Sequence, residues 1–351
     1  MVVEVPKSTP SNKEVYLSGN FEGWSGGRAQ FRLKEIDGKH FISIPRQAKD
    51  LQYKFTLGSW DFVERDDKGN NIENRHYAFE KDNDTIYAKV LSWANPEDKP
   101  TINSSASENV MVLDDAMEMP QLNLKRRIWV YLPPDYKTSK KSYPVLYMHD
   151  GQNIFDVATS YAGEWEVDET LNRLQKENGL ELIVIGIDNG DENRMNEYSP
   201  WENPAVLNPQ GDAYLKFIVE TLKPKVDSTF RTKTDKSNTA IMGSSMGGLI
   251  SHYAGLNYSD TFGRIGVFSP SFWISEKGFE NAKKKSSSAH NKMYFLMGSR
   301  EGSDMIDNME RMKNVMLSNG FESDNQNYDI VEGGTHSENF WRREFPKAIS
   351  W

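Results

Sequence analysis

The sequence contains no cysteine among its 351 residues. Disulfide bridges, a thiolate nucleophile and thiolate metal sites are therefore excluded. It also lacks an apolar run near the roughly 18 residues that a membrane-spanning helix needs. The opening residues MVVEVPKSTPSNKEV do not join a charged start to an apolar segment, as a signal peptide would. We expect either a cytoplasmic protein or, as the favoured alternative, a secreted or periplasmic one whose signal has been removed.

Positively charged residues are fewer than negatively charged ones. The chain has 42 Lys and Arg against 51 Asp and Glu, which gives a formal net charge of −9. Nucleic-acid binding rests on neutralising phosphates with cationic side chains, so this balance argues against a nucleic-acid partner. It argues more weakly against polyanionic substrates, since a local basic pocket could override the overall sign. Hydrophobic content of 37% and charged content of 26% are ordinary for globular domains, and the length suits two of them.

The region from 12 to 95 is expected to be a small all-β sandwich. In LQYKFTL, at 51–57, apolar and polar residues alternate strictly, which is typical of a half-buried strand. Turn-forming clusters such as DDKGNN separate this stretch from other short strand-like segments, and we find no convincing helix. The other expected strands lie in VYLSGN, HFISIP and TIYAKVLSW. A segment rich in Pro, Ser and Asn follows, and we expect a linker at 96–109.

From 110 to 351 the pattern changes to that of an α/β domain. YPVLYMHD, LELIVIGID and KMYFLMG are continuous apolar runs, as expected of strands buried on both faces of a parallel sheet. Helix-length amphipathic segments alternate with them, at 164–178, 212–227 and 304–320. In the last segment, methionines recur every three or four residues, which indicates a core-facing helix stripe. Strand alternating with helix predicts a mostly parallel sheet with helices on both faces.

The stretch TAIMGSSMGGLISHYAGL, at 239–256, carries the strongest chemical signal. A Gly-x-Ser-x-Gly motif between a buried strand and a helix is typical of a nucleophile elbow. The sharp turn would lift Ser245 clear of the sheet, and Gly243 and Gly247 supply the small neighbours that its strained backbone needs. Gly248 would let the helix pack closely, and the helix N-terminus adds free N–H groups. The alternative is a Gly- and Ser-rich loop that only tightens a strand-to-helix turn.

A serine nucleophile needs a base, and the base needs an orienting acid. The expected chain order is Ser, acid, His, and His336 is the one histidine of six that follows the predicted strand at 292–298. Glu301 lies just past that strand and is the favoured acid. Asp304 stays open as the acid, although its spacing suits the N-cap of the next helix. A surface-loop histidine and a solvated loop carboxylate are the ordinary alternatives.

The oxyanion of an acyl-transfer intermediate needs two backbone donors. One would be the N–H of Met246, which directly follows the nucleophile. The other would come from the loop YMHDGQNIF after an early strand, as the N–H of Gly151 or Gln152. His149 and Asp150 precede the nucleophile and end a strand, so we interpret them as residues that shape this loop.

Four separated blocks resemble an esterase family of α/β-hydrolases that includes feruloyl and acetyl-xylan esterases, S-formylglutathione hydrolase and siderophore esterases. They are RRIWVYLPPDY, YPVLYMHDGQNIFD, GSSMGGLISHYAGLNYSDTFGRIGVFSPSFW and GGTHSENFWRREFPKAISW. The resemblance implies an α/β-hydrolase fold, the roles given above for Ser245, Glu301 and His336, and no metal or organic cofactor. It also suggests that Trp273 borders the site. Arg194 and Tyr198, in DENRMNEYSPW, are further candidates for the pocket wall.

The front half resembles the starch-binding-like sandwich modules attached to many carbohydrate enzymes. VYLSGNFEGW and YKFTLGSWDFVERDDKGNNIENR carry this resemblance, and they supply the Trp60, Glu64, Asn74 and Arg75 positions. Exposed tryptophans stack on sugar rings, so Trp24 and Trp60 are candidates for glycan binding. Such modules often serve as packing domains instead.

Three functions remain open from the sequence. The first is a serine esterase that removes acetyl or feruloyl groups from plant-type polysaccharide or oligosaccharide. The second is a siderophore esterase for an enterobactin-type trilactone, which the net charge disfavours because the ferric substrates are strongly anionic. The third is a catalytically silent glycan-binding protein. The expected partner in each enzyme hypothesis is an ester substrate, without nucleic acid or a transmembrane segment.

Overall fold

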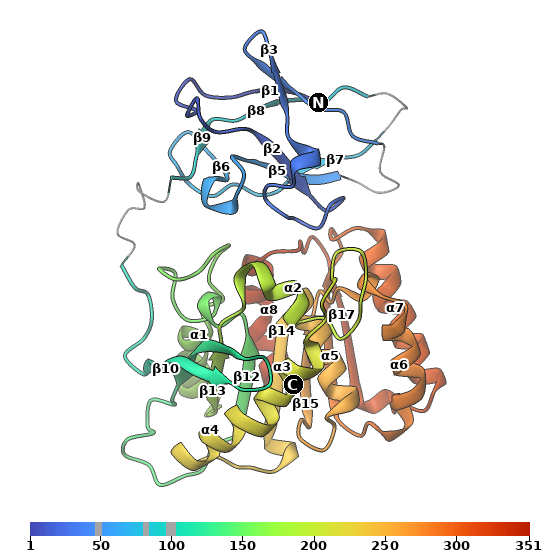
Figure 1. The fold of residues 1–351 in the computed structure, drawn as a ribbon. Helices are drawn as coiled ribbons and strands as arrows, with labels where there is room; N and C mark the ends of the chain where they lie inside the picture. Colours follow the sequence, from blue (N-terminus) through green and yellow to red (C-terminus); the bar gives the residue numbers. More distant parts are fainter. Residues whose placement is uncertain (46–50, 80–83, 96–102) are drawn as a thin grey trace. The chain divides into compact units, whose positions relative to one another are not determined.

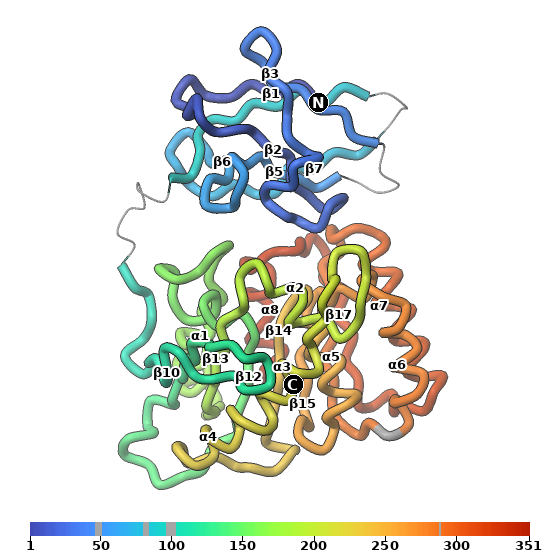
Figure 2. Tube along the Cα trace, in the orientation of Figure 1, coloured from blue at the N-terminus to red at the C-terminus, as the bar shows by residue number. Residues whose placement is uncertain are grey.

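Short strands with alternating apolar side chains make up the first part of the chain, and longer apolar strands make up the second. The computed structural model describes residues 1–45, 51–79, 84–95 and 103–351. The chain divides into two units, Met1–Ile102 and Asn103–Trp351. Figures 1 and 2 follow the chain through both units. Of the expected linker at 96–109, residues 96–102 lie outside the described residues.

In the first unit the described strands form three small sheets, ordered β3-β4-β1-β8, β2-β5-β7 and β6-β9. The helical segments described there are short 3-10 turns, at Ala29–Phe31 and Trp60–Phe62, and the sequence predicted no convincing helix in this region. The strands are Val2–Glu4 (β1), Tyr16–Gly19 (β2), Lys34–Ile36 (β3), Lys39–Phe41 (β4), Leu51–Thr56 (β5), Glu64–Arg65 (β6), Arg75–Tyr77 (β7), Tyr87–Lys89 (β8) and Ser92–Trp93 (β9).

The strict alternation at 51–57 corresponds to β5, which lies between β2 and β7. Its apolar positions, Leu51, Tyr53, Phe55 and Leu57, are all buried in the core of this unit. The strand expected at 40–45 is shorter than predicted, because β4 ends at Phe41. The period-2 pattern therefore located the central strand of the unit well and the end of β4 less well.

One eight-stranded sheet organises the second unit, in the order β10-β11-β13-β12-β14-β15-β16-β17. β10 and β11 form an antiparallel pair, β11 is antiparallel to β13, and every later neighbour is parallel. The strands are Val110–Met119 (β10), Leu124–Tyr131 (β11), Val145–His149 (β12), Ile183–Ile187 (β13), Thr239–Ser244 (β14), Arg264–Phe268 (β15), Lys292–Gly298 (β16) and Gln326–Val331 (β17). This confirms the expected α/β-hydrolase architecture, which follows the small β unit in the sequence.

The helices connect these strands and cover the sheet. They are Val167–Asn178 (α1), Arg194–Glu197 (α2), Gly211–Lys216 (α3), Lys223–Thr229 (α4), Met246–Asn257 (α5), Lys277–Lys285 (α6), Ser303–Ser318 (α7) and Glu338–Ser350 (α8). A π-helical segment, Phe217–Leu222, joins α3 to α4, so the single helix expected at 212–227 is interrupted. Pro224, which has no backbone N–H to donate, follows this wider turn. None of the helices within the described residues is long and apolar enough to cross a bilayer.

The two faces of the sheet bury separate apolar cores, because side chains along a strand point alternately to opposite sides. In β12, Val145 and Tyr147 belong to one core, and Leu146 and Met148 belong to the other. Helices α3, α5, α6 and α7 supply the first core, and α1 and α8 supply the second. The methionine stripe of α7 faces the first core, as predicted, with Met309, Met312 and Met316 buried.

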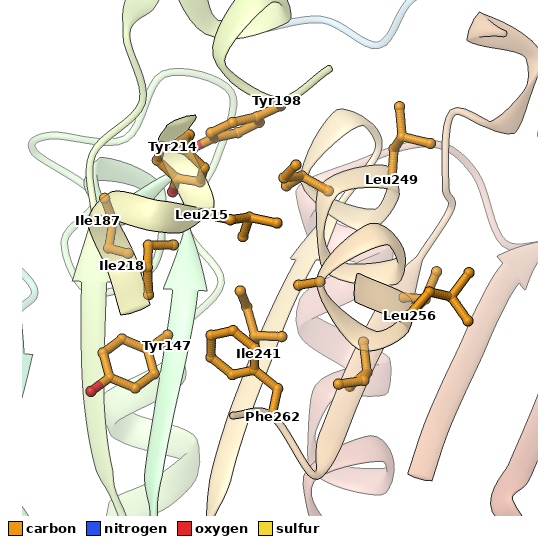
Figure 3. Packing of buried hydrophobic residues seen from close by; sticks show 14 of the residues in the cluster. Tyr147, Ile187, Tyr198, Tyr214, Leu215, Ile218, Ile241, Leu249, Leu256 and Phe262 are labelled. Atoms are coloured by element: carbon orange, nitrogen blue, oxygen red, sulfur yellow. The ribbon is translucent and has the colours of Figure 1, made fainter. Parts of the chain in front are cut away.

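Figure 3 shows part of the first core from close by, with Ile241 of β14 among Tyr147, Ile218 and Phe262. These residues come from strands, a helical segment and a loop that are far apart in the sequence. Ile241 is fully buried in this cluster. The strand that leads into the Gly-Ser turn is therefore anchored at its centre.

We expect Ile241→Ala to lower the free energy of unfolding by about 2–5 kcal/mol, because it removes buried methyl groups and leaves a cavity. Urea unfolding of the full chain measures this change. Leu207→Ala is the matched control: Leu207 is 83% exposed, so its loss should change stability by no more than about 0.5 kcal/mol. Equal effects of the two substitutions would contradict this description of the core.

Candidate active site

Ser245 lies in a sharp turn between the end of β14 and the start of α5. Its backbone has φ +60° and ψ −119°, a conformation that non-glycine residues rarely adopt. The turn is held from the neighbouring strand, because the Ser245 N–H donates to the Phe268 carbonyl at 2.9 Å. In return, the Ser271 N–H donates to the Ser245 carbonyl at 3.1 Å. Strain of this kind costs about 1–3 kcal/mol and persists only where surrounding contacts enforce it.

The glycines around Ser245 are required by close backbone contacts. A Cβ atom on Gly243 would lie 2.8 Å from the His149 ring and 3.0 Å from the Gly247 carbonyl carbon. A Cβ atom on Gly248 would lie 2.6 Å from the Phe268 carbonyl oxygen. Helix α5 can therefore begin directly against β15, with its first N–H groups beside the Ser245 side chain.

Glu301 lies just past β16 and is almost fully buried, with 5% of its surface exposed. One carboxylate oxygen, Oε1, accepts hydrogen bonds from Ser269 Oγ at 2.6 Å and from the Gly298 N–H at 2.8 Å. The other, Oε2, lies 2.7 Å from His336 Nδ1. The alternative acid, Asp304, lies in the first turn of α7, whose N-cap is Gly302. The expectation of an Asp304 N-cap is therefore wrong, because the helix begins one residue after Gly302, at Ser303.

The loop that carries His336 crosses over the end of β16. A Cβ atom on Gly298 would collide with the Gly334 backbone, and the Arg300 N–H donates to the Gly334 carbonyl at 2.9 Å. The imidazole packs edge-on against Trp341, with ring centroids 5.0 Å apart, and its side chain is 30% exposed. Because Nδ1 faces Glu301, Nε2 is the nitrogen left to exchange a proton with a substrate or a nucleophile.

The hydroxyl of Ser245 contacts a different partner. Its Oγ lies 3.3 Å from Ser271 Oγ, and the described residues contain no hydrogen bond between Ser245 and His336. In ligand-free enzymes such a bond is often long and shortens only when substrate binds. The structure thus joins Glu301 to His336 directly and places Ser245 at the carboxyl end of the same sheet, two strands away.

Sequence reasoning missed three residues that support this arrangement: Ser269, Ser271 and Trp341. Ser269 donates to Glu301 and accepts a hydrogen bond from Trp341 Nε1 at 2.8 Å. Its backbone is left-handed, with φ +43°. Ser271 contacts Ser245 from the same turn. The block SPSFW, at 269–273, contained the signal, because two serines directly after a buried strand stand at the edge where such sites form.

The second predicted oxyanion donor lies in a 3-10 turn, Gly151–Asn153, after β12. Asp150 enters this turn in the left-handed conformation, with φ +59°. A Cβ atom on Gly151 would lie 2.8 Å from backbone atoms of Gly186 and Ile187, so only glycine fits against β13 there. Gln152 is held by its side chain, because Oε1 accepts from the Asn189 N–H at 3.0 Å.

Arg194 and Tyr198, which were expected at the pocket wall, instead contact Asp150, the residue that enters this 3-10 turn. Arg194 pairs with Asp150 through Nε–Oδ1 at 2.5 Å and Nη2–Oδ2 at 2.8 Å. Tyr198 is fully buried, and its hydroxyl accepts from the Asp150 N–H at 3.2 Å. Burial alone would raise the pKa of the Asp150 carboxyl, but the charge of Arg194 and the hydrogen bonds from Arg194 and Asn189 hold it below its ordinary value.

Other titratable side chains nearby are governed by burial. His149 packs between Tyr198 and Tyr214, and burial lowers its pKa to about 3, so it is a neutral packing residue. This agrees with its interpretation as a loop-shaping residue. Burial also raises the pKa of the Glu338 carboxyl, at the start of α8, where the charges of His336, Asp150 and Arg194 act on it. Trp273, on the turn after Ser271, is 46% exposed.

The candidate glycan residues of the first unit lie together. Trp60 Nε1 donates to the Trp24 carbonyl at 2.9 Å, and the two rings are tilted with centroids 6.1 Å apart. Both side chains are partly buried. Glu64 is buried, accepts from the Phe55 N–H at 3.0 Å and pairs with Arg75 at 2.8 Å. The Glu64 and Arg75 positions of the resemblance therefore hold β5, β6 and β7 together.

The Asp150–Arg194 pair generates a stability prediction. Arg194→Gln should lower the free energy of unfolding by about 2–4 kcal/mol, because it leaves the Asp150 carboxylate without its partner. Asp150→Asn should have a similar effect, and the double variant should lose less than the sum of the two. Urea unfolding of the full chain measures all three. Arg173→Gln, which breaks the exposed Arg173–Glu177 pair, is the control and should cost about 0.5 kcal/mol or less. Strict additivity would contradict the coupling.

Comparisons with known proteins give relatives for both parts of the chain. The uncharacterized protein YbbA of Bacillus subtilis is 27% identical over 246 residues, which cover 64% of this chain and 92% of YbbA. An endo-1,4-beta-xylanase/feruloyl esterase of Xylanibacter ruminicola is 26% identical over 218 residues, covering 61% of this chain and 27% of that protein. An alpha-amylase of Niallia circulans is 36% identical over 93 residues, covering 26% of this chain and 7% of the amylase, and partly covers the N-terminal β region.

Solved structures show the same fold. The enterobactin esterase Fes of Shigella flexneri, crystallised in the presence of enterobactin, aligns with a TM-score of 0.57 at 15% identity, over 96% of this chain and 87% of Fes. A ferulic acid esterase aligns with a TM-score of 0.51 at 19% identity, over 69% of this chain and 97% of that one. At these identities the likeness establishes the fold alone.

Residues 120–351 match the family model described as "Putative esterase". The match spans the strands and helices that carry Ser245, Glu301 and His336. The chain therefore belongs to this esterase family of α/β-hydrolases.

Proposed function

We propose that this protein is a serine carboxylic-ester hydrolase that acts on acylated carbohydrate through an acyl-enzyme on Ser245. The observation that carries the proposal is the pairing of two features at the carboxyl end of one parallel sheet. Ser245 stands on a left-handed turn at the N-terminus of α5, and His336 Nδ1 lies 2.7 Å from the buried carboxylate of Glu301. A hydroxyl, an imidazole and an orienting carboxylate are the groups that acyl transfer requires.

In the first half-reaction, Ser245 Oγ attacks the ester carbonyl carbon while His336 Nε2 takes the hydroxyl proton. Glu301 holds the imidazole in the tautomer with Nδ1 protonated and stabilises the imidazolium that forms. The carbonyl oxygen becomes an oxyanion, which accepts hydrogen bonds from the Met246 N–H and from the Gly151 or Gln152 N–H. Collapse of this intermediate breaks the bond to the alcohol oxygen, and the alcohol leaves with the proton from His336.

In the second half-reaction, a water molecule attacks the acyl-enzyme while His336 takes one of its protons. The second tetrahedral intermediate uses the same backbone donors. Its collapse returns the proton to Ser245 Oγ and releases the carboxylic acid. The Asp150–Arg194 pair keeps the oxyanion turn in place throughout.

The substrate class proposed for this site is an acetyl or feruloyl ester of a plant-type saccharide. The Xylanibacter ruminicola relative combines a xylanase with a feruloyl esterase, and the part of it that is similar to this chain spans 218 residues. The half-exposed ring of Trp273, next to Ser271, offers a flat apolar surface for an aromatic acyl group or a sugar ring. The first unit, with Trp24 and Trp60, is proposed to contribute to glycan binding only as a secondary surface.

A siderophore trilactone is the second candidate substrate, because the likeness to Fes extends over 96% of this chain and so includes the first unit. The charges near the site disfavour it. Arg194 is neutralised by Asp150, and the whole chain has a formal charge of −9. A strongly anionic ferric complex would be repelled by this arrangement.

Labelling with a fluorescent organophosphonate tests the nucleophile. Wild type should react, and Ser245→Ala should lose the label completely while keeping its fold by circular dichroism. Ser237→Ala, which changes an exposed serine near the start of β14, is the control and should label like wild type. An unlabelled wild-type protein would argue for a silent binding protein.

His336→Ala should lower kcat for nitrophenyl acetate by about a thousandfold or more, as expected for the loss of a triad base.

A substrate panel tests the acyl and alcohol specificity. We expect kcat/KM on feruloyl or acetyl xylo-oligosaccharides to exceed kcat/KM on a ferric enterobactin-type trilactone by about a hundredfold or more, since Arg194, the cation at the oxyanion turn, is already paired with Asp150. Trp273→Ala should raise KM for feruloyl esters more than for acetyl esters, because it removes an aromatic contact. Faster turnover of the ferric trilactone would replace the carbohydrate assignment with the siderophore one and leave the serine mechanism intact.

A further inference from the structure

A cluster of three carboxylates lies apart from the hydrolase site, at the start of α1. Glu164, Asp168 and Glu169 each place an acceptor oxygen within 4.8 Å of the others. Asp168 is fully buried, Glu164 is 7% exposed and Glu169 is partly buried. Three like charges this close repel one another strongly unless protons or a cation separate them.

Each of these carboxylates has one buried oxygen without a hydrogen-bond donor. They are Glu164 Oε1, Asp168 Oδ1 and Glu169 Oε2. The second oxygens of Glu164 and Asp168 are occupied, because Glu164 Oε2 accepts from Ser105 Oγ at 2.9 Å and Asp168 Oδ2 accepts from the Ser107 N–H at 2.8 Å. The unpartnered oxygens are therefore the ones left for a ligand, and leaving them unpaired in the interior is costly.

The neighbouring acidic residues show how carboxylates in this region are otherwise satisfied. Asp156 accepts from Ser104 Oγ at 2.7 Å and from the N–H groups of Ser105 and Ala158. Glu166 pairs with Arg342 of α8 at 2.7 Å. The three clustered carboxylates differ from both. Each keeps one buried oxygen that receives neither a hydrogen bond nor an ion pair from the described residues.

We propose that Glu164, Asp168 and Glu169 bind a divalent cation with a preference for oxygen ligands, Ca²⁺ above all. The three acceptor oxygens lie within 4.8 Å of one another, close enough to share one cation. Ca²⁺ accepts irregular sets of oxygen ligands, whereas Mg²⁺ demands near-ideal octahedral geometry at about 2.1 Å. The ligands are all carboxylates, without imidazole or thiolate, which disfavours zinc and copper. A bound divalent ion would supply positive charge among these three carboxylates and would give their unpartnered buried oxygens a ligand.

The bound cation would fasten two parts of the second unit together. Residues 103–109, the first of that unit, are tied to the cluster through Ser105 and Ser107. On the other side, Trp165 packs against Trp341 with ring centroids 5.8 Å apart, and Trp341 donates to Ser269, the partner of Glu301. The proposed role of the site is therefore structural. It is linked through Trp165 and Trp341 to Ser269, the residue that donates to Glu301.

Terbium luminescence tests the site on the full chain after chelator treatment. Tb³⁺ stands in for Ca²⁺, and Trp165, next to Glu164, can transfer excitation energy to it. We expect saturable sensitised emission in wild type that Ca²⁺ displaces at lower concentration than Mg²⁺. Glu164→Gln and Asp168→Asn should weaken Tb³⁺ binding by about tenfold or more, because each removes one charged ligand. Glu166→Gln, a neighbouring carboxylate outside the cluster, should bind like wild type.

Thermal unfolding gives an independent readout. Ca²⁺ should raise the melting temperature of wild type and of Glu166→Gln, and at the same concentration it should raise that of Asp168→Asn by a smaller amount. If Asp168→Asn does not fold, Glu169→Gln takes its place, because Glu169 is only partly buried. Absence of sensitised emission and of a calcium-dependent shift in wild type would overturn the proposal, as would equal responses in wild type and the cluster variants. Neither readout depends on hydrolysis, so the result is independent of the proposed esterase function.

Discussion

The left-handed backbone at Ser245 is the constraint on which the second unit is built. A non-glycine residue stays at φ +60° only if neighbours on both sides hold it there. Here the hydrogen bonds of Ser245 and Ser271 with adjacent backbone hold it, and Gly243 and Gly248 let β12, β14 and β15 approach α5 closely. The buried core around Ile241 then provides the stability that offsets the local strain.

A chain of hydrogen bonds on the other side of the sheet orients the imidazole. Trp341 donates to Ser269, Ser269 donates to Glu301, and Glu301 faces His336. Trp341 belongs to the apolar core that α1 and α8 form, so the packing of that face reaches the candidate acid directly. The proposed cation site lies beside Trp165, which packs against Trp341 in this core, and it would stabilise the same face.

The Asp150–Arg194 ion pair holds a backbone turn of the second unit in place. Arg194 is a natural candidate for contacting an anionic substrate, yet it pairs with Asp150 and fixes the turn that carries Gly151. In the first unit, Glu64 and Arg75 hold three strands together in the same way. Residues that a motif associates with ligands therefore also satisfy buried polar groups. Because Arg194 is already paired with Asp150, the substrate we propose is uncharged near the reacting ester.

The sequence by itself determined the features that depend on near neighbours in the chain. Period-2 alternation located β5, continuous apolar runs located β12, β13 and β16, and the Gly-x-Ser-x-Gly turn marked Ser245. These patterns express which faces are buried and which backbone angles a residue tolerates. The order Ser, acid, His pointed to His336, and the position just past the strand at 292–298 favoured Glu301 while leaving Asp304 open; the structure joins Glu301 to His336 by a hydrogen bond.

Only the tertiary structure decided the partnerships between distant residues. The pairing of Asp150 with Arg194, the contact of Ser271 with Ser245 and the bond from Trp341 to Ser269 join segments 26 to 72 positions apart. The order of strands in the sheet sets which loops meet at its edge, and spacing along the chain does not encode that order. For the same physical reason, the convergence of Ser105, Ser107 and three carboxylates at α1 could be found only once the chain was folded.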